Sequence, residues 1–208
     1  MSTINRKAIP FCFGLLIMAS TGSAQSLSVY TGVGTATDGS SHQQIDTFGN
    51  GVNFTTPKLT GLFEDFGATF MVTPHFGANV NLSWRFNQGN YAGLNYRPLF
   101  YDFNGVWVPV HTRFFVPEVQ AGIGGVHTGF SVNQQSCDQF VGCINSNTPV
   151  ESSTHFQGHF GVAARVYLAR NVFLRPAVDA HYVNNFFQFG SNWVPEYTIG
   201  VGFTFGQR

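Results

Sequence analysis

Charged side chains are scarce in this sequence. Only 10% of the 208 residues are Asp, Glu, Lys or Arg, against about 25% in typical soluble domains. A surface that faces water normally needs more charge than this, whereas a surface that faces lipid does not. Basic and acidic residues also balance, ten against ten, and no basic cluster is present that could neutralise phosphates. We therefore expect no nucleic-acid partner.

Long apolar runs are missing after residue 24, where no stretch approaches the roughly 18 apolar residues that indicate a membrane-spanning helix. Before that point a basic segment, Arg6–Lys7, precedes an apolar segment, Ala8–Ala19, and a small-residue cleavage site, Gly22–Ala24. This order predicts a secretory signal peptide over residues 1–24. Without Arg6 and Lys7, the predicted mature chain has eight basic residues against ten acidic ones.

Cysteine is rare too, with three residues in the whole sequence. Cys12 falls within the predicted signal peptide, whereas Cys137 and Cys143 enclose five residues further along. Because an exported chain meets an oxidising compartment, we predict a disulfide between Cys137 and Cys143.

Aromatic residues, in contrast, are abundant: they make up 16% of the sequence and include 23 Phe. They recur in an alternating pattern, as in residues 78–86 (ANVNLSWRF), where apolar residues alternate with Asn, Ser and Arg. Successive side chains of a strand point to opposite faces, so alternation predicts strands with one apolar and one polar face. Eight strands are predicted: Ser26–Ala36, Thr60–Val72, Gly77–Asn87, Leu99–Trp107, Phe115–His127, His155–Leu168, Phe173–Val183 and Tyr197–Phe205.

The connections between these strands alternate in length. The short ones are Thr73–Phe76, Val108–Phe114 and Ala169–Val172, and the longer ones are Thr37–Leu59, Gln88–Pro98, Thr128–Thr154 and Asn184–Glu196. Outer-membrane barrels have this order of short periplasmic turns and longer external loops. Alternation alone would also fit a soluble sandwich. The connections favour an all-β fold, a closed eight-stranded antiparallel up-and-down transmembrane β-barrel over residues 25–208.

A family resemblance is carried by the outward-facing aromatics, the turn Thr73–Gly77 (TPHFG) and the final stretch Tyr197–Phe205 (YTIGVGFTF). In these the chain resembles the small eight-stranded outer-membrane β-barrel family and is similar to the transmembrane domain of outer-membrane protein A. The resemblance covers residues 25–208 as a pattern. It implies a bacterial outer-membrane location, contact with outer-membrane lipid, insertion by the barrel-assembly machinery and a monomeric protein. No cofactor is indicated, and no partner of the loops is named by the sequence.

The polar faces of the predicted strands hold charged residues and two histidines. They are Asp65, Arg85, Asp102, Glu118, Arg165, Arg175 and Asp179, with His159 and His181. Three arginines against four carboxylates come close to the pairing that buried charges need. An eight-stranded barrel is just wide enough to be filled by side chains. We predict a network that fills the lumen, in which Arg85 pairs with Asp102 or Asp65.

His159 and His181 belong to strands joined by the short connection Ala169–Val172, so they should lie nearly opposite each other. Two close imidazoles could bind a metal or respond to pH near neutrality. They could also be polar filler, and we assign no metal site from the sequence.

Aromatic residues at the strand ends predict two interfacial girdles. The outer set is Tyr91, Tyr96, Trp193 and Tyr197, and the inner set is Phe76, Trp107, Phe114, Phe115 and Phe173.

Three functional hypotheses follow. The leading one is a non-enzymatic integral outer-membrane protein with a structural or surface-interaction role, a filled lumen and exposed loops. The alternative is a narrow channel for small or hydrophobic solutes, in which the charged lumen network or a lateral gap conducts. A lipid-modifying enzyme would need a His with a Ser nucleophile or a similar partner, and the spacing of His127, Ser131 and Glu151 is not specific for one.

Overall fold

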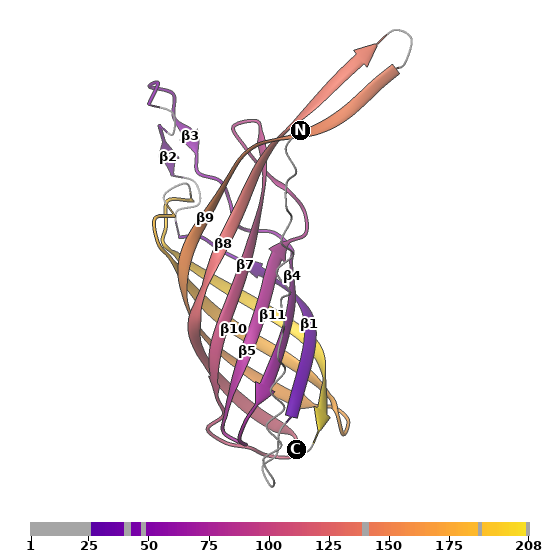
Figure 1. Cartoon of the computed structure of the whole chain (residues 1–208). Helices are drawn as coiled ribbons and strands as arrows, with labels where there is room; N and C mark the ends of the chain where they lie inside the picture. Colours follow the sequence, from indigo (N-terminus) through magenta and orange to yellow (C-terminus); the bar gives the residue numbers. More distant parts are fainter. Residues whose placement is uncertain (1–25, 40–42, 47–48, 139–141, 187–188, 207–208) are drawn as a thin grey trace, which may run out of the picture.

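A computed structural model describes residues 26–39, 43–46, 49–138, 142–186 and 189–206. Within these ranges, eight long strands close into one antiparallel barrel (Figure 1). They are β1 (Ser26–Ala36), β4 (Phe63–Met71), β5 (Phe76–Arg85), β7 (Leu94–Trp107), β8 (Phe115–Asp138), β9 (Gly142–Tyr167), β10 (Val172–Val183) and β11 (Trp193–Gly206). The predicted fold class is confirmed. The predicted signal peptide lies outside the described residues and stays a prediction.

Each long strand pairs with the next, and the first and last strands, β1 and β11, pair from Ser26↔Gly206 to Ala36↔Glu196 to complete the ring. Three short strands accompany the ring. β2 (Gln44–Ile45) and β3 (Phe54–Thr55) pair with each other in a separate small sheet, and β6 (Gly89–Tyr91) extends the barrel sheet by pairing with the start of β7. No helix of the described chain is long and apolar enough to cross a membrane.

The short connections all lie at one end of the barrel, which we call the turn end, together with Ser26 and Gly206. Threonine hydroxyls close two of these turns. Thr73 Oγ1 accepts the amide of Phe76 at 3.0 Å, and Thr112 Oγ1 accepts the amide of Phe115 at 3.0 Å. Such local side-chain acceptors favour a turn over a continued strand. The opposite end, where the longer connections lie, is the loop end.

The connection Thr128–Thr154 differs most from its prediction. Most of Thr128–Thr154 is not an irregular loop, because β8 and β9 continue through it as a two-stranded hairpin that rises beyond the loop end (Figure 1). The last pairing of β7 with β8 is Asn95↔Ser131. Beyond it, Val132–Asp138 and Gly142–Thr148 pair only with each other among the described residues. We call these two segments the ribbon.

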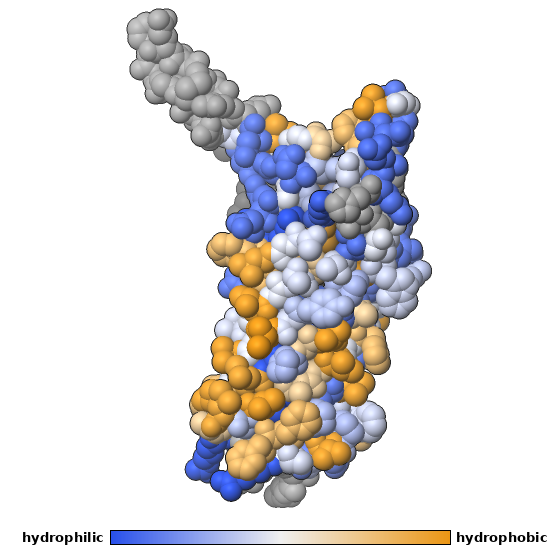
Figure 2. Space-filling view, turned by 180° about the vertical axis from the view of Figure 1, so that it is seen from behind, coloured by the Kyte–Doolittle hydropathy of each residue, from blue (hydrophilic) through white to orange (hydrophobic). Residues whose placement is uncertain are grey.

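The outer wall of the barrel is apolar. Figure 2 shows apolar residues gathered over the lower wall and hydrophilic residues around its upper end. Large exposed side chains include Phe66, Phe70, Phe103, Ile123, Phe160, Val162, Ile199 and Val201. Water-soluble monomers rarely expose a continuous apolar surface of this kind. Lipid is therefore the solvent that fits the wall, and the soluble sandwich is excluded by the closed barrel.

Glycines on the inner face let large groups and neighbouring strands approach closely. A Cβ added at Gly124 of β8 would lie well inside van der Waals contact of the Tyr101 carbonyl oxygen and 2.6 Å from Asp102 Oδ1. A Cβ added at Gly129, further along the same strand, would meet no heavy atom within 4 Å. The close approach of β7 therefore leaves no room for a side chain at Gly124, whereas a side chain at Gly129, on the outward face of β8, would meet open space.

We expect Gly124→Ala to destabilise the barrel by about 1–3 kcal/mol, because a main-chain carbonyl has to move to make room. Gly129→Ala is the matched control on β8 and should leave stability within about 0.5 kcal/mol. Urea titration of the folded, faster-migrating gel band in detergent measures both. Equal midpoints for the two variants would contradict the close approach of β7 and β8.

Candidate functional site

The polar interior begins near the turn end with two buried arginines that share one carboxylate. Arg165 Nη2 lies 2.7 Å from Glu118 Oε1, and Arg175 Nε lies 3.3 Å from Glu118 Oε2. The three side chains come from β8, β9 and β10, and each is at most 4% exposed. Both oxygens of the carboxylate thus bind a cation, which is the pairing that buried charges need.

Aromatic and hydroxyl groups surround these arginines. The Arg175 guanidinium lies 4.1 Å from the ring centroid of Tyr30, close enough for a cation–π contact. Arg165 Nη1 donates to Ser28 Oγ at 2.9 Å, and Ser28 is itself 2.9 Å from Thr204 Oγ1. These contacts join β9 and β10 to the closing pair of strands, β1 and β11.

Amide side chains carry the network across the middle of the lumen. Asn79 Nδ2 donates to the Tyr30 hydroxyl at 3.1 Å and to Thr69 Oγ1 at 2.9 Å. On the next strand, Asn104 Oδ1 lies 2.7 Å from Nδ1 of His159. The other ring nitrogen of His159 lies 3.0 Å from Asp179 Oδ1. Hydrogen bonds therefore run from β4 and β5 through β7 to β9 and β10.

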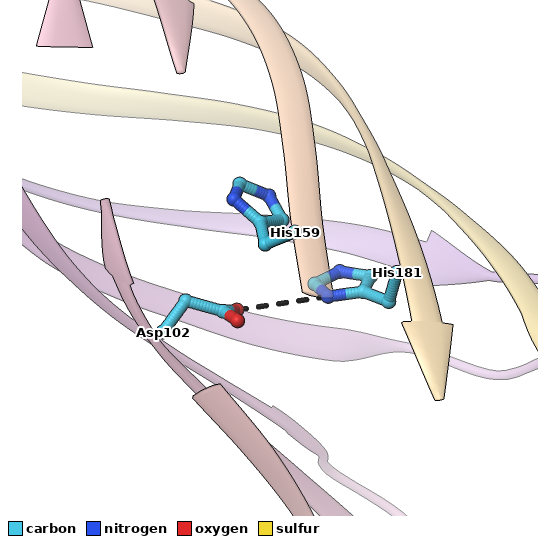
Figure 3. Close-up of side chains that lie close together, drawn as sticks. All are labelled: Asp102, His159 and His181. Carbon is cyan, nitrogen blue, oxygen red and sulfur yellow. Dashed lines mark ion pairs between the residues drawn. The ribbon is translucent and has the colours of Figure 1, made fainter. Parts of the chain in front are cut away.

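The two histidines lie side by side nearer the loop end. Their rings are 4.9 Å apart, and β9 and β10 pair them directly, as expected from the short connection. His181 Nε2 lies 3.1 Å from Glu196 Oε2, and His181 Nδ1 lies 3.6 Å from Asp102 Oδ2. Figure 3 shows the Asp102 carboxylate and both imidazoles converging from three strands.

Glu196 is a member of this network that the sequence analysis missed. It was assigned to the connection Asn184–Glu196, but it is 1% exposed, faces the lumen from β11, and accepts a hydrogen bond from Ser83 on the far wall. A signal was present, because extending the alternation of Tyr197–Phe205 back by one residue places Glu196 on the inner face. The described lumen thus holds five buried carboxylates, Asp65, Asp102, Glu118, Asp179 and Glu196, against two buried arginines.

Arg85 does not join the buried network. Its guanidinium donates to the main-chain carbonyls of Lys58 at 3.1 Å and Thr60 at 2.8 Å, and to the Tyr96 hydroxyl at 3.1 Å. The predicted pairing with Asp102 or Asp65 is therefore wrong. The physical reason is position: Arg85 is the last residue of β5, above the buried charges, where unpaired loop carbonyls are the nearest acceptors. Its hydrogen bonds hold the segment around Lys58 at the loop end of the barrel.

Apolar side chains seal the polar layer at both ends. At the loop end the buried cluster, which we call the outer plug, contains Ala36, Leu59, Phe63, Tyr91, Tyr96, Phe100, Val126, Val183, Phe186, Phe189 and Val194. At the turn end the inner plug contains Tyr30, Met71, Val106, Val108, Val116, Tyr167 and Phe173. Tyr91, Tyr96 and Phe173 were predicted to be girdle residues facing lipid, and for these three the prediction is wrong because they face inward.

The remaining sequence candidates lie on or near the ribbon. His127 Nδ1 lies 2.9 Å from Thr154 Oγ1, and Ser131 lies four residues further along β8, about 13 Å away at the rise of a strand. No catalytic His–Ser contact is formed between them. Cys137 and Cys143 occupy directly opposed backbone positions. Their side chains lie outside the described part of the structure, so the disulfide stays a prediction.

No protein-family model and no curated protein matches the sequence. Solved structures do match it. OprG from Pseudomonas aeruginosa is 15% identical with a TM-score of 0.53, covering 89% of this chain and 98% of that one. Neisserial surface protein A is 12% identical with a TM-score of 0.53, covering 88% and 98%. The chain has the fold of the small outer-membrane β-barrels. Another barrel of this fold, the attachment invasion locus protein Ail of Yersinia pestis in complex with the heparin analogue sucrose octasulfate, is 13% identical with a TM-score of 0.50, covering 88% and 100%.

We expect Glu118→Gln to destabilise this outer-membrane-type barrel by about 3–5 kcal/mol, because it removes the carboxylate that two buried arginines share. Glu151→Gln, at an exposed position, is the control and should change stability by no more than about 0.5 kcal/mol. Urea unfolding in lipid vesicles, followed by tryptophan fluorescence, measures the difference. A Glu118→Gln variant as stable as the control would show that the arginines do not depend on this pair.

Proposed function

We propose that this protein is an integral outer-membrane protein whose barrel is a closed scaffold that presents its loops and the ribbon to the cell exterior. The observation that carries the proposal is the sealing of the polar lumen between two apolar plugs. By the usual orientation of outer-membrane barrels, the turn end faces the periplasm and the loop end faces outward. The barrel then serves as an anchor, and recognition falls to the loop end.

The sealing argues against the narrow-channel alternative. At the loop end, Phe63, Phe100, Phe186 and Phe189 are all 0% exposed. At the turn end, Val108, Val116 and Phe173 are also 0% exposed. An ion that crossed the outer plug would lose its hydration among its phenylalanine rings without a compensating partner, and this costs tens of kcal/mol in an apolar medium. Between the plugs, the Glu118 carboxylate is engaged with both Arg165 and Arg175, which supports a structural role for these charges.

The outward-facing segments are poor in positive charge. Across 37–62, 86–98, 128–154 and 184–195 there are two basic residues, Lys58 and Arg97, against four acidic ones, Asp38, Asp46, Asp138 and Glu151. A polyanion such as the heparin analogue bound by Ail needs clustered cations. We therefore propose that this chain recognises an uncharged polar surface through its loop end, and not a sulfated one.

The same part of the chain supports a non-enzymatic role. A serine hydrolase places its nucleophile within hydrogen-bond reach of a histidine, whereas His127 and Ser131 lie about four strand residues apart. His127 is engaged instead with Thr154.

Planar-bilayer recording tests the scaffold against the channel. Purified wild-type protein should give no reproducible single-channel steps under conditions in which a general porin, as positive control, does. Wild-type steps whose size changes in the lumen variant Asp102→Ala would show that solute passes through the lumen, and the scaffold proposal would be abandoned. Steps that are identical in wild type and variant would indicate a contaminating porin, and the recording would be repeated after the porin has been removed.

The opposed cysteines generate a second expectation. An isolated two-stranded hairpin is marginally stable in water, so a disulfide between Cys137 and Cys143 should hold the ribbon together. In the double variant Cys137→Ser, Cys143→Ser we expect normal insertion and heat-modifiable migration, because the barrel ladder does not involve these residues. Cleavage of the ribbon by protease added to intact cells should increase. Two free thiols in mass spectrometry of the exported wild-type protein would disprove the disulfide.

A further inference from the structure

The two lumen histidines and Asp102 have the arrangement of a metal site. One ligand atom from each of Asp102, His159 and His181 lies within 4.8 Å of the other two, and all three residues are buried. They come from β7, β9 and β10, so a bound ion would link three strands across the lumen (Figure 3). Two imidazoles and a carboxylate suit zinc and neighbouring divalent transition metals, whereas calcium and magnesium prefer all-oxygen sites.

The nitrogen that would face the ion is unsatisfied. Nδ1 of His181 is buried and has no hydrogen-bond partner among the described residues. The nearest carboxylate oxygen, Asp102 Oδ2, is 3.6 Å away, which is too long for a hydrogen bond. Ligand atoms that sit 2.0–2.2 Å from a tetrahedral metal lie about 3.3–3.6 Å from one another. The separation therefore fits two ligands of one ion better than a direct contact.

Both histidines also have the outer partners that metal-bound histidines normally have. Nε2 of His181 lies 3.1 Å from Glu196 Oε2, and Nε2 of His159 lies 3.0 Å from Asp179 Oδ1. A carboxylate on the far nitrogen fixes the ring and makes the near nitrogen a better ligand. Both Nδ1 atoms are thus directed toward the side chains of β7. His159 would exchange its present contact with Asn104 Oδ1, 2.7 Å long, for the metal.

The charge of the lumen gives an independent reason for a cation. Five buried carboxylates face two buried arginines, both of which are engaged with Glu118. The other four carboxylates have no arginine partner among the described residues. Three of these four, Asp102, Asp179 and Glu196, surround the histidines. Unpaired buried charge is strongly unfavourable. A divalent ion between the histidines would supply two positive charges at the point where the carboxylates gather.

We propose that Asp102, His159 and His181 bind a divalent transition metal of the zinc class, with Glu196 and Asp179 as positioning residues. The site is structural, because the plugs close the lumen on both sides and leave no route for a substrate. The ion enters while the barrel forms, and it ties β7 to β9 and β10 once the barrel has closed. The inference is independent of the proposed surface role.

The test refolds the mature protein from urea into detergent micelles, in ZnCl2 or in EDTA, followed by removal of unbound metal. We expect one zinc per chain by elemental analysis after the first refolding, and a higher urea midpoint for the zinc-refolded protein. EDTA added after folding should remove the ion slowly. Refolding with Co2+ should give the visible absorption of a tetrahedral cobalt site with nitrogen and oxygen ligands.

The variants separate ligands from bystanders. His181→Gln should weaken zinc binding by more than about 100-fold. Glu196→Gln should weaken it by about 10–100-fold, because Glu196 contacts His181 at Nε2, the ring nitrogen that does not face the ion. The control His127→Gln, at the exposed histidine beside Thr154, should bind zinc as the wild type does. If His181→Gln fails to fold, the wild-type metal content and cobalt spectrum still decide the question. Zinc content far below one per chain with equal midpoints in ZnCl2 and EDTA would overturn the proposal, as would full zinc binding by a folded His181→Gln variant.

Discussion

Every other feature of this structure depends on the requirement that a backbone in lipid satisfy its hydrogen bonds internally. A sheet can meet it only by closing, and closure here depends on the pairing of β1 with β11 from Ser26↔Gly206 to Ala36↔Glu196. Once the ring is closed, side chains alternate between two very different solvents. Phe, Val and Ile side chains face the lipid on the outside. The side chains on the inside must fit within a narrow lumen.

The lumen is arranged in layers because its polar groups have no access to bulk water. Arginine, histidine, amide and carboxylate groups lie together in the middle, where they form hydrogen bonds and ion pairs with one another. Aromatic and aliphatic groups close both ends. Small residues on the inner face, such as Gly124, provide the room that the main chain of the neighbouring strand and the Asp102 carboxylate occupy. A soluble domain has an apolar core and a polar surface, whereas this barrel has a polar core and an apolar wall. The difference arises because lipid, and not water, surrounds the wall.

The eight strands and their inward and outward faces could be predicted from the sequence, because lipid on one side enforces a period of two along every strand. The ribbon could not, since its many Ser, Asn and Gln residues leave no apolar alternation to detect. Glu196 was missed because the last strand was predicted to begin too late, at Tyr197, whereas β11 begins at Trp193. Arg85 was misplaced because alternation gives the face of a residue but not its height in the barrel. Tyr96 and Phe173 show the same limit, because an aromatic near a strand end fits a girdle or a plug equally well until the strand register is known.

The pairing of β1 with β11 also has a consequence for the order of assembly. The strands that complete the ring lie near opposite ends of the chain, so their contacts have the longest loop to close and form late. Ser28 meets Thr204, and Glu196 meets His181 and Ser83, only when β11 is in place. A nascent chain that lacks β11 therefore has neither a closed backbone nor a complete interior. Synthesis of β11 must therefore be complete before the barrel can close.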